Sequence, residues 1–158
     1  IAREIERDET HFKPMIDMDM VSVNHEITAQ LARSAVRAST NLPVKYVVLD
    51  TKTGRTGRYL AAFRGRKTVM AVCYQLHAQR ILALSYGVVP ILRNQELRDK
   101  YHFLIDALEF LDQYSKLADD DLLAIVGGSF GPDGGASYIE FASVRNIRRR
   151  NAEIEAHK

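Results

Sequence analysis

The chain has 158 residues, of which 46% are hydrophobic and 27% charged, the size and composition of one ordinary globular domain. Its net charge of +2 is too small to indicate a nucleic-acid partner, and no apolar run approaches the roughly 20 residues that a membrane span needs. The single cysteine, Cys73, cannot form a disulfide within the chain, which favours a reducing, cytoplasmic compartment. Because the sequence starts at Ile1 and not at methionine, an excised piece of a longer protein and a natural stand-alone domain both stay open.

Residues 1–23 are expected to precede the main domain. Residues 1–8 alternate acidic and basic side chains around three apolar ones, a spacing that fits the last turns of a helix. Residues 9–23 contain one proline and three methionines without a clean period, so we expect a linker that lies along the domain. Such a segment often joins two domains, and residues 1–23 are therefore predicted to be the end of a preceding domain's helix and its linker.

Helical and extended patterns alternate within residues 24–144. Apolar residues spaced three and four apart predict helices, short apolar runs predict the first four strands, and an alternating pattern predicts the fifth. The predicted helices cover residues 24–40, 53–65, 76–86 and 95–116, and the predicted strands cover residues 45–50, 68–73, 88–92, 122–126 and 137–144.

The last two predicted strands are separated only by the glycine-rich residues 127–135. This connection has no room for a helix, so these two strands must pair antiparallel, whereas each earlier pair of strands is separated by a predicted helix. We therefore expect an α/β fold, a three-layer α/β/α sandwich with a five-stranded, mostly parallel sheet. The expected strand order is 3-2-1-4-5, with the last strand antiparallel.

Residues 145–158 are expected to form a charged tail. A solvated segment is favoured over a nucleic-acid contact, because a short basic run alone indicates little. The basic cluster of this segment consists of Arg145, Arg148, Arg149 and Arg150. The three consecutive aspartates at residues 119–121 are likewise interpreted as a solvated turn and not as a cation site. The five histidines have no ligand spacing, so no metal site is expected.

A turn rich in hydroxyls and cations follows the first predicted strand. It consists of Thr51, Lys52, Thr53, Gly54, Arg55 and Thr56. The backbone N–H groups at the start of the next helix lack intrahelical partners, and together with the positive end of the helix dipole they attract an anion. Threonine hydroxyls can donate to phosphate oxygens, and Lys52 and Arg55 add positive charge. The turn is predicted to bind phosphate, although threonines that only cap the helix are an equally open interpretation.

The glycine-rich loop is predicted to lie opposite this turn. Ligands of open α/β sheets bind beyond the carboxyl ends of the strands, where the connections diverge to opposite faces. The turn follows the first predicted strand, and the loop of residues 127–135 follows the fourth. If these two strands are neighbours, the turn and the loop face each other across one crevice, in which the turn holds a phosphate and the loop closes over it.

Two other motifs overlap with the turn and the loop. Residues 127–131 match the G-x-S-x-G of a hydrolase nucleophile elbow, but that elbow needs a helix directly after the serine, and here a strand follows. Residues 51–56 match T-x-T-G-x-T, the flavodoxin phosphate loop, so a module that binds flavin mononucleotide stays an alternative, as does a stand-alone phosphate-binding module. Only Phe130 and Tyr138 are obvious side chains for stacking on a flavin, which favours a phosphate over a flavin.

Three motifs occur in the order found in one known family. Residues 51–56 resemble its T-x-S/T-G-R-S/T, which follows an apolar strand. Phe63 and Arg64, with the apolar residues 69–72, resemble the second strand of the family and the basic residue before it. Residues 79–90 are similar to A-R-x-L-x-L-x-x-G-V-x-P, the most specific signature of the three.

On these motifs, residues 46–144 resemble the C-terminal domain of pyruvate kinase, and we place the domain at residues 24–144. Residues 1–8 resemble the I-x-x-E-x-E end of the last helix in the family's catalytic barrel. Gly57 and Gly65 depart from the alanine and the proline that are usual in the family, and residues 136–137 replace a common Thr-Asn.

The resemblance implies that this domain holds an allosteric site. The turn would bind a phosphate of a sugar-phosphate or nucleotide effector, and a loop would close on that effector. The loop consists of Phe130, Gly131, Pro132, Asp133, Gly134 and Gly135. The catalytic residues belong to the barrel, so this domain is expected to contain neither a catalytic residue nor a cofactor and to be inactive alone.

The resemblance also implies what the whole enzyme does. In glycolysis it would transfer a phosphoryl group from phosphoenolpyruvate to ADP, with magnesium and a monovalent cation, potassium. The implied partners of this domain are the effector, its own catalytic barrel and further copies of the chain in a homo-oligomer. No nucleic-acid or membrane partner is expected.

Overall fold

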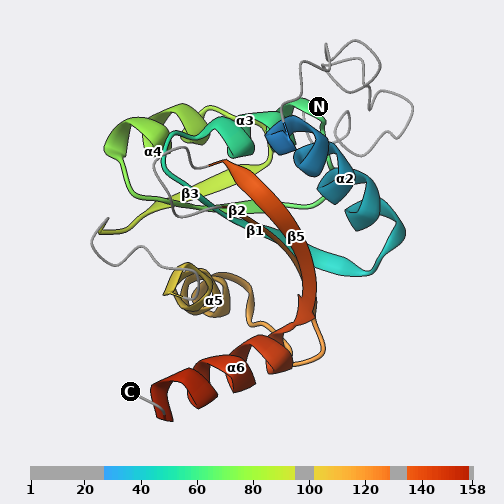
Figure 1. Ribbon diagram of the computed structural model, residues 1–158, viewed down its shortest axis with the longest axis vertical. Coiled ribbons are helices and arrows are strands. Elements are labelled where there is room, and N and C mark those ends of the chain that lie inside the picture. Colours follow the sequence, from blue (N-terminus) through green and yellow to red (C-terminus); the bar gives the residue numbers. More distant parts are fainter. Residues whose placement is uncertain (1–26, 95–101, 129–134, 157–158) are drawn as a thin grey trace.

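The computed structural model describes residues 27–94, 102–128 and 135–156 (Figure 1). The predictions for residues 1–23 and for most of the glycine-rich loop lie outside the described residues. The elements are α2 (Ile27–Asn41), β1 (Val44–Thr51), α3 (Arg55–Ala62), β2 (Val69–Cys73), α4 (Leu76–Ala83), β3 (Val88–Leu92), α5 (His102–Ser115), β4 (Leu122–Gly128), β5 (Ala136–Ser143) and α6 (Val144–Ala156).

The five strands form one sheet in the order β3-β2-β1-β4-β5, which confirms the predicted order. The central strand β1 pairs parallel with β2 on one side and with β4 on the other. β2 pairs parallel with β3, and β4 pairs antiparallel with β5. The chain therefore runs outward from β1 to β3 and returns to the other side of β1, so the connections that leave β1 and β4 diverge at the same edge of the sheet.

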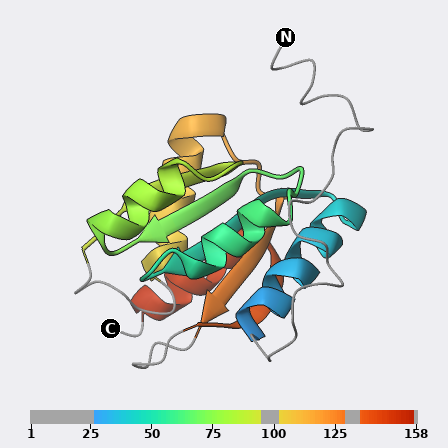
Figure 2. The ribbon, with the colours of Figure 1, turned by 90° about the horizontal axis from the view of Figure 1, so that it is seen from above.

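The helices cover both faces of the sheet, as a three-layer sandwich requires. Helices α2, α3 and α4 pack on one face, and α5 and α6 pack on the other (Figures 1 and 2). Side chains of β1 alternate between the two cores: Val47 and Leu49 face the first group of helices, and Val48 faces the second. Within the described parts of the chain, every helix is too short or too polar to span a membrane.

The predicted solvated tail, residues 145–158, is not what the structure has over residues 145–156, which belong to the helix α6 (Val144–Ala156). Ile147 is buried against α5 and the sheet with an exposed fraction of 1%. Arg148 donates through Nη2 to Asp112 of α5 at 2.7 Å and through Nη1 to Asp119 at 2.6 Å. The arginine cluster thus belongs to a helix that packs on the domain, and Asp119, which we interpreted as part of a solvated turn, is one of its partners.

Candidate functional site

The conformation of the turn after β1 is fixed by the backbone of Gly54 and by the hydroxyl of Thr51. Gly54, the residue before α3, has φ 81°, a left-handed conformation that glycine adopts without a steric penalty. Its N–H donates to the Thr51 hydroxyl oxygen at 2.9 Å, and its carbonyl accepts the Arg58 N–H at 3.0 Å. Gly54 has no side chain and therefore makes no side-chain cap hydrogen bond to α3. The N–H groups that begin a helix favour an anion at such a position.

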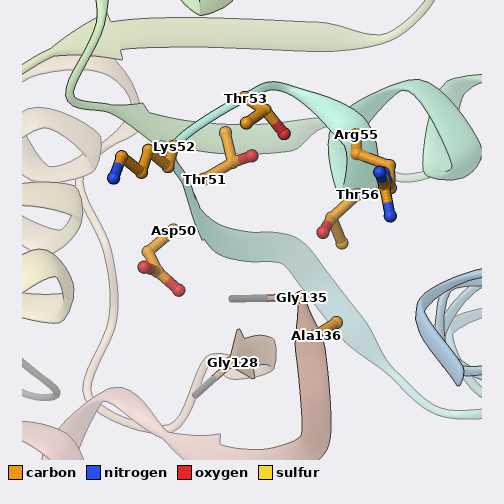
Figure 3. Close-up of a pocket in the computed structure, with 9 residues that line it drawn as sticks. All are labelled: Asp50, Thr51, Lys52, Thr53, Arg55, Thr56, Gly128, Gly135 and Ala136. Atoms are coloured by element: carbon orange, nitrogen blue, oxygen red, sulfur yellow. The ribbon is translucent and has the colours of Figure 1, made fainter. Parts of the chain in front are cut away.

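A pocket lies between this turn and the start of β5 (Figure 3). On one side it is lined by the turn, and on the other by the residues that flank the glycine-rich loop. The lining residues are Asp50, Thr51, Lys52, Thr53, Arg55, Thr56, Gly128, Gly135 and Ala136. The volume of the pocket is about 20 Å³, enough for one small group of a ligand.

The sheet topology brings the two sides of the pocket together. Because β4 is the neighbour of β1, its last residue Gly128 ends beside the turn. The antiparallel return of β5 places Gly135 and Ala136 at the same edge. A Cβ atom at Gly128 would collide with the Gly135 carbonyl oxygen, so the close approach of these two backbones requires glycine.

The lining of the pocket combines positive charge, hydroxyls and one carboxylate. Thr51 and Thr56 are buried, with exposed fractions of 5% and 6%, whereas Lys52 and Arg55 are exposed. Asp50 is also buried, at 6% exposed. Buried hydroxyls and exposed cations in one lining can together hold a small anion, the hydroxyls through hydrogen bonds and the cations through charge.

Helix α4 supports the turn from the side opposite the pocket. Leu82 of α4 is fully buried, and its side chain packs against α3 where two glycines leave room. A Cβ atom at Gly57 would lie 2.7 Å from Leu82 Cδ2, and one at Gly54 would lie 3.5 Å from Leu82 Cγ. The position of the turn therefore depends on the contact between α3 and α4.

The pocket contains no activated nucleophile among the described residues. Cys73 ends β2 beside Thr51 in the sheet, but burial raises the pKa of its thiol to about 11 and keeps it protonated at neutral pH. The described ranges also contain no group of three or more histidine, cysteine, aspartate or glutamate side chains that could hold a metal ion. This arrangement can bind a small anion, and nothing in the described lining activates one.

The predicted site residues are brought together to the extent that the structure describes them. Every predicted turn residue except Gly54 lines the pocket, and Gly54 sets the geometry of the turn. Of the predicted loop, Gly135 lines the pocket, and residues 130–134 lie outside the described residues. That these residues bind a phosphate stays a prediction.

Three of the lining residues, Asp50, Gly128 and Ala136, were not among the predicted site residues, although Gly128 belongs to the loop that we expected opposite the turn. The available signal was their position, because Asp50 ends a predicted strand, Gly128 follows one closely and Ala136 directly precedes one, all at this edge of the sheet. Asp50 was counted as the last residue of its strand, and nothing in the local pattern marked it as part of a pocket.

Comparison with known proteins gives a consistent result. Residues 29–140 match the family model described as "Pyruvate kinase, alpha/beta domain". The chain is 25% identical over 155 residues to a pyruvate kinase of Borreliella burgdorferi, an alignment that covers 96% of this chain and 32% of the relative. It is also 25% identical over 155 residues to pyruvate kinase 2 of a Synechocystis species, with 98% of this chain and 25% of the relative covered.

A shorter match has a higher identity. The chain is 33% identical over 93 residues to pyruvate kinase PKLR of Rattus norvegicus, which covers 58% of this chain and 16% of the relative. The chain therefore spans at most about a third of the length of these curated relatives.

Proposed function

The chain belongs to the family of pyruvate kinase alpha/beta domains, and we propose that it is the regulatory C-terminal domain of a pyruvate kinase. The whole enzyme, on this proposal, transfers a phosphoryl group from phosphoenolpyruvate to ADP. The relatives of this name support that activity, and because they are at least about three times longer than the aligned part, the activity is carried over only as a proposal.

We propose that the pocket binds the phosphate group of a small effector. The observation that carries this proposal is the convergence of the turn and the loop-flanking residues on one small pocket at the carboxyl ends of β1 and β4. The N–H groups that begin α3 and the Thr56 hydroxyl can donate to the phosphate oxygens, while Lys52 and Arg55 balance their charge. The Thr51 oxygen accepts the Gly54 N–H, and the hydroxyl proton of Thr51 is the group that it can donate to a phosphate oxygen.

The proposed role of the domain is to hold the phosphate without reacting with it. The chemical step is proposed to belong to a separate barrel domain, and the chain alone is proposed to be inactive. Magnesium and potassium are implied for the whole enzyme, and we propose that they act in the barrel domain. The described residues of this chain contain no group of three or more histidine, cysteine, aspartate or glutamate side chains that could hold a metal ion.

Regulation would follow from the closure of the glycine-rich loop over the bound effector. A ligand shifts a conformational equilibrium only as far as it binds one state better than the other, and a loop that closes on the effector supplies this difference. We propose that the closed loop biases contacts between copies of the chain in a homo-oligomer, through which the catalytic domains respond.

The proposal is tested by titrating inorganic phosphate into the isotopically labelled chain and following its backbone amide signals by NMR. We expect saturable shifts of the amides of the turn and of the start of α3. The isosteric variant Thr56→Val removes a buried donor and should weaken binding about tenfold. Thr40→Val, which removes a hydroxyl bonded to the Val36 carbonyl at the far end of α2, is the matched control and should bind as the wild type does. Equal binding by Thr56→Val and wild type would rule out the assignment.

The flavin alternative has less support than the phosphate effector. Flavodoxin-like sheets have the strand order 2-1-3-4-5, whereas here β1 lies between β2 and β4 and the last strand is antiparallel. The family match also concerns pyruvate kinases and not flavodoxins.

A further inference from the structure

One feature of the pocket does not fit a site that binds phosphate alone, and that feature is the Asp50 carboxylate. Asp50 is 6% exposed, lines the pocket and points between the turn and the side formed by Gly128 and Gly135 (Figure 3). Its negative charge lies in the lining that also contains the exposed cations Lys52 and Arg55. An ionised carboxylate repels a phosphate, and in a partly desolvated pocket this repulsion is screened less than in water.

A carboxylate in such a place favours a ligand with a hydrogen-bond donor. An ionised carboxylate only accepts hydrogen bonds, and its two oxygens offer about four lone-pair sites, so it retains capacity for a ligand beside the contacts that it makes within the protein. A hydroxyl on the carbon skeleton next to the phosphate can donate to Asp50 while the phosphate lies at the start of α3. Inorganic phosphate or an alkyl phosphate is repelled by the Asp50 carboxylate and cannot offset this repulsion with such a hydrogen bond.

We propose that Asp50 is a specificity-determining residue of this pocket, which selects a phosphomonoester that carries a neighbouring hydroxyl over a phosphate without one. The inference rests on the proposed phosphate site. It assigns different roles to the two parts of the pocket: the turn binds the phosphate of any such ligand, and Asp50 distinguishes ligands with a neighbouring hydroxyl from ligands without one.

The test compares two ligands with the same three-carbon skeleton, glycerol 3-phosphate and propyl phosphate, by NMR titration of the wild-type chain. We expect glycerol 3-phosphate to bind about tenfold more tightly, the effect of one hydrogen bond to a charged acceptor. If the wild-type chain binds the two ligands with nearly equal affinity, the inference is overturned. This comparison uses only the wild-type chain, so it does not depend on the folding of a variant.

The near-isosteric variant Asp50→Asn separates the effect of charge from that of shape. It should bind propyl phosphate and inorganic phosphate about threefold more tightly, because the like charge is gone, and the ratio between the two ligands should fall at least about threefold. An unchanged ratio in a variant that keeps the wild-type amide spectrum outside the pocket overturns the inference. Magnesium that strengthens propyl phosphate binding to the wild type and not to Asp50→Asn would assign Asp50 to a cation instead, and overturns it too.

The Thr56→Val variant distinguishes this inference from the proposal on which it rests. It should weaken binding of both ligands by the same factor and leave their ratio unchanged, since Thr56 is proposed to donate to the phosphate that both ligands share. If the wild type binds neither ligand, the phosphate site itself is wrong. If it binds both equally and Thr56→Val weakens both, the phosphate site stands and only the role of Asp50 is overturned.

Discussion

Replacing Gly57 by alanine tests the packing that positions the turn. In the first turn of α3, alanine should raise the free energy of unfolding by up to about 1 kcal/mol, because glycine costs more backbone entropy. The new Cβ, however, would lie 2.7 Å and 2.9 Å from the two δ carbons of Leu82, which is fully buried. Overpacking of this kind costs about 1–3 kcal/mol, so Gly57→Ala should lower the free energy of unfolding by about 1 kcal/mol.

The effect of Gly57→Ala on the free energy of unfolding should change sign when Leu82 is replaced by a smaller residue. Leu82→Ala alone should cost about 2–5 kcal/mol, as for other fully buried leucines. In that background the clash is gone, and Gly57→Ala should stabilise by up to about 1 kcal/mol, which gives a coupling of about 2 kcal/mol between the two sites. Urea unfolding of the four proteins measures this cycle.

Gly87→Ala serves as the control for this cycle. Gly87 has φ 68° and nothing within 4 Å of its added Cβ, so its substitution is destabilising for a backbone reason that does not involve Leu82. Its effect should be the same in both backgrounds. The packing argument is refuted if Gly57→Ala has the same sign and size with and without Leu82.

Two further predictions concern other parts of the domain. Ile147→Ala should lower the free energy of unfolding by about 2–4 kcal/mol and more than Ile154→Ala, a partly buried position on the same helix, whereas a solvated tail would show no change in urea unfolding. The pKa of Asp121 is lowered, first by the hydrogen bond from Lys45 at 2.5 Å, so this carboxylate stabilises the fold above its unfolded pKa of about 4 and loses that effect as the pH falls through its folded pKa. Asp121→Asn should therefore cost about 1 kcal/mol at pH 7 and much less at pH 3, and a difference independent of pH would contradict this assignment.

The local pattern of the sequence predicted most of the sheet. The first four strands are short apolar runs, and the fifth alternates apolar and polar residues. The connection between the last two strands is too short for a helix, which makes their pairing antiparallel for steric reasons. The turn after β1 was also identifiable, because its hydroxyls, its cations and Gly54 are contiguous in the sequence. These features depend on residues that are close together in the chain, and a local sequence pattern can therefore predict them.

Helix α6 was missed because its stabilising contacts are distant in sequence. Between Arg145 and Arg150 only Ile147 is buried, so the local pattern there is mainly that of a charged segment. An isolated charged helix of about 13 residues is marginal in water. The helix forms because Ile147 is buried in the core that α5 contributes to, while Arg148 reaches Asp112 and Asp119. Most of the stability of such a helix comes from tertiary packing, which no local pattern reports.

By itself, the sequence determined the order of the five strands, the direction of the last strand and a turn rich in hydroxyls and cations. Only the tertiary structure decided what lies opposite that turn. Pairing of β4 with β1 places Gly128, Gly135 and Ala136 across the pocket, and the end of β1 adds the buried carboxylate of Asp50. The physical reason is that charge and hydrogen-bonding capacity belong to single residues, whereas the desolvation and the distances that make a site selective arise only when distant segments pack together.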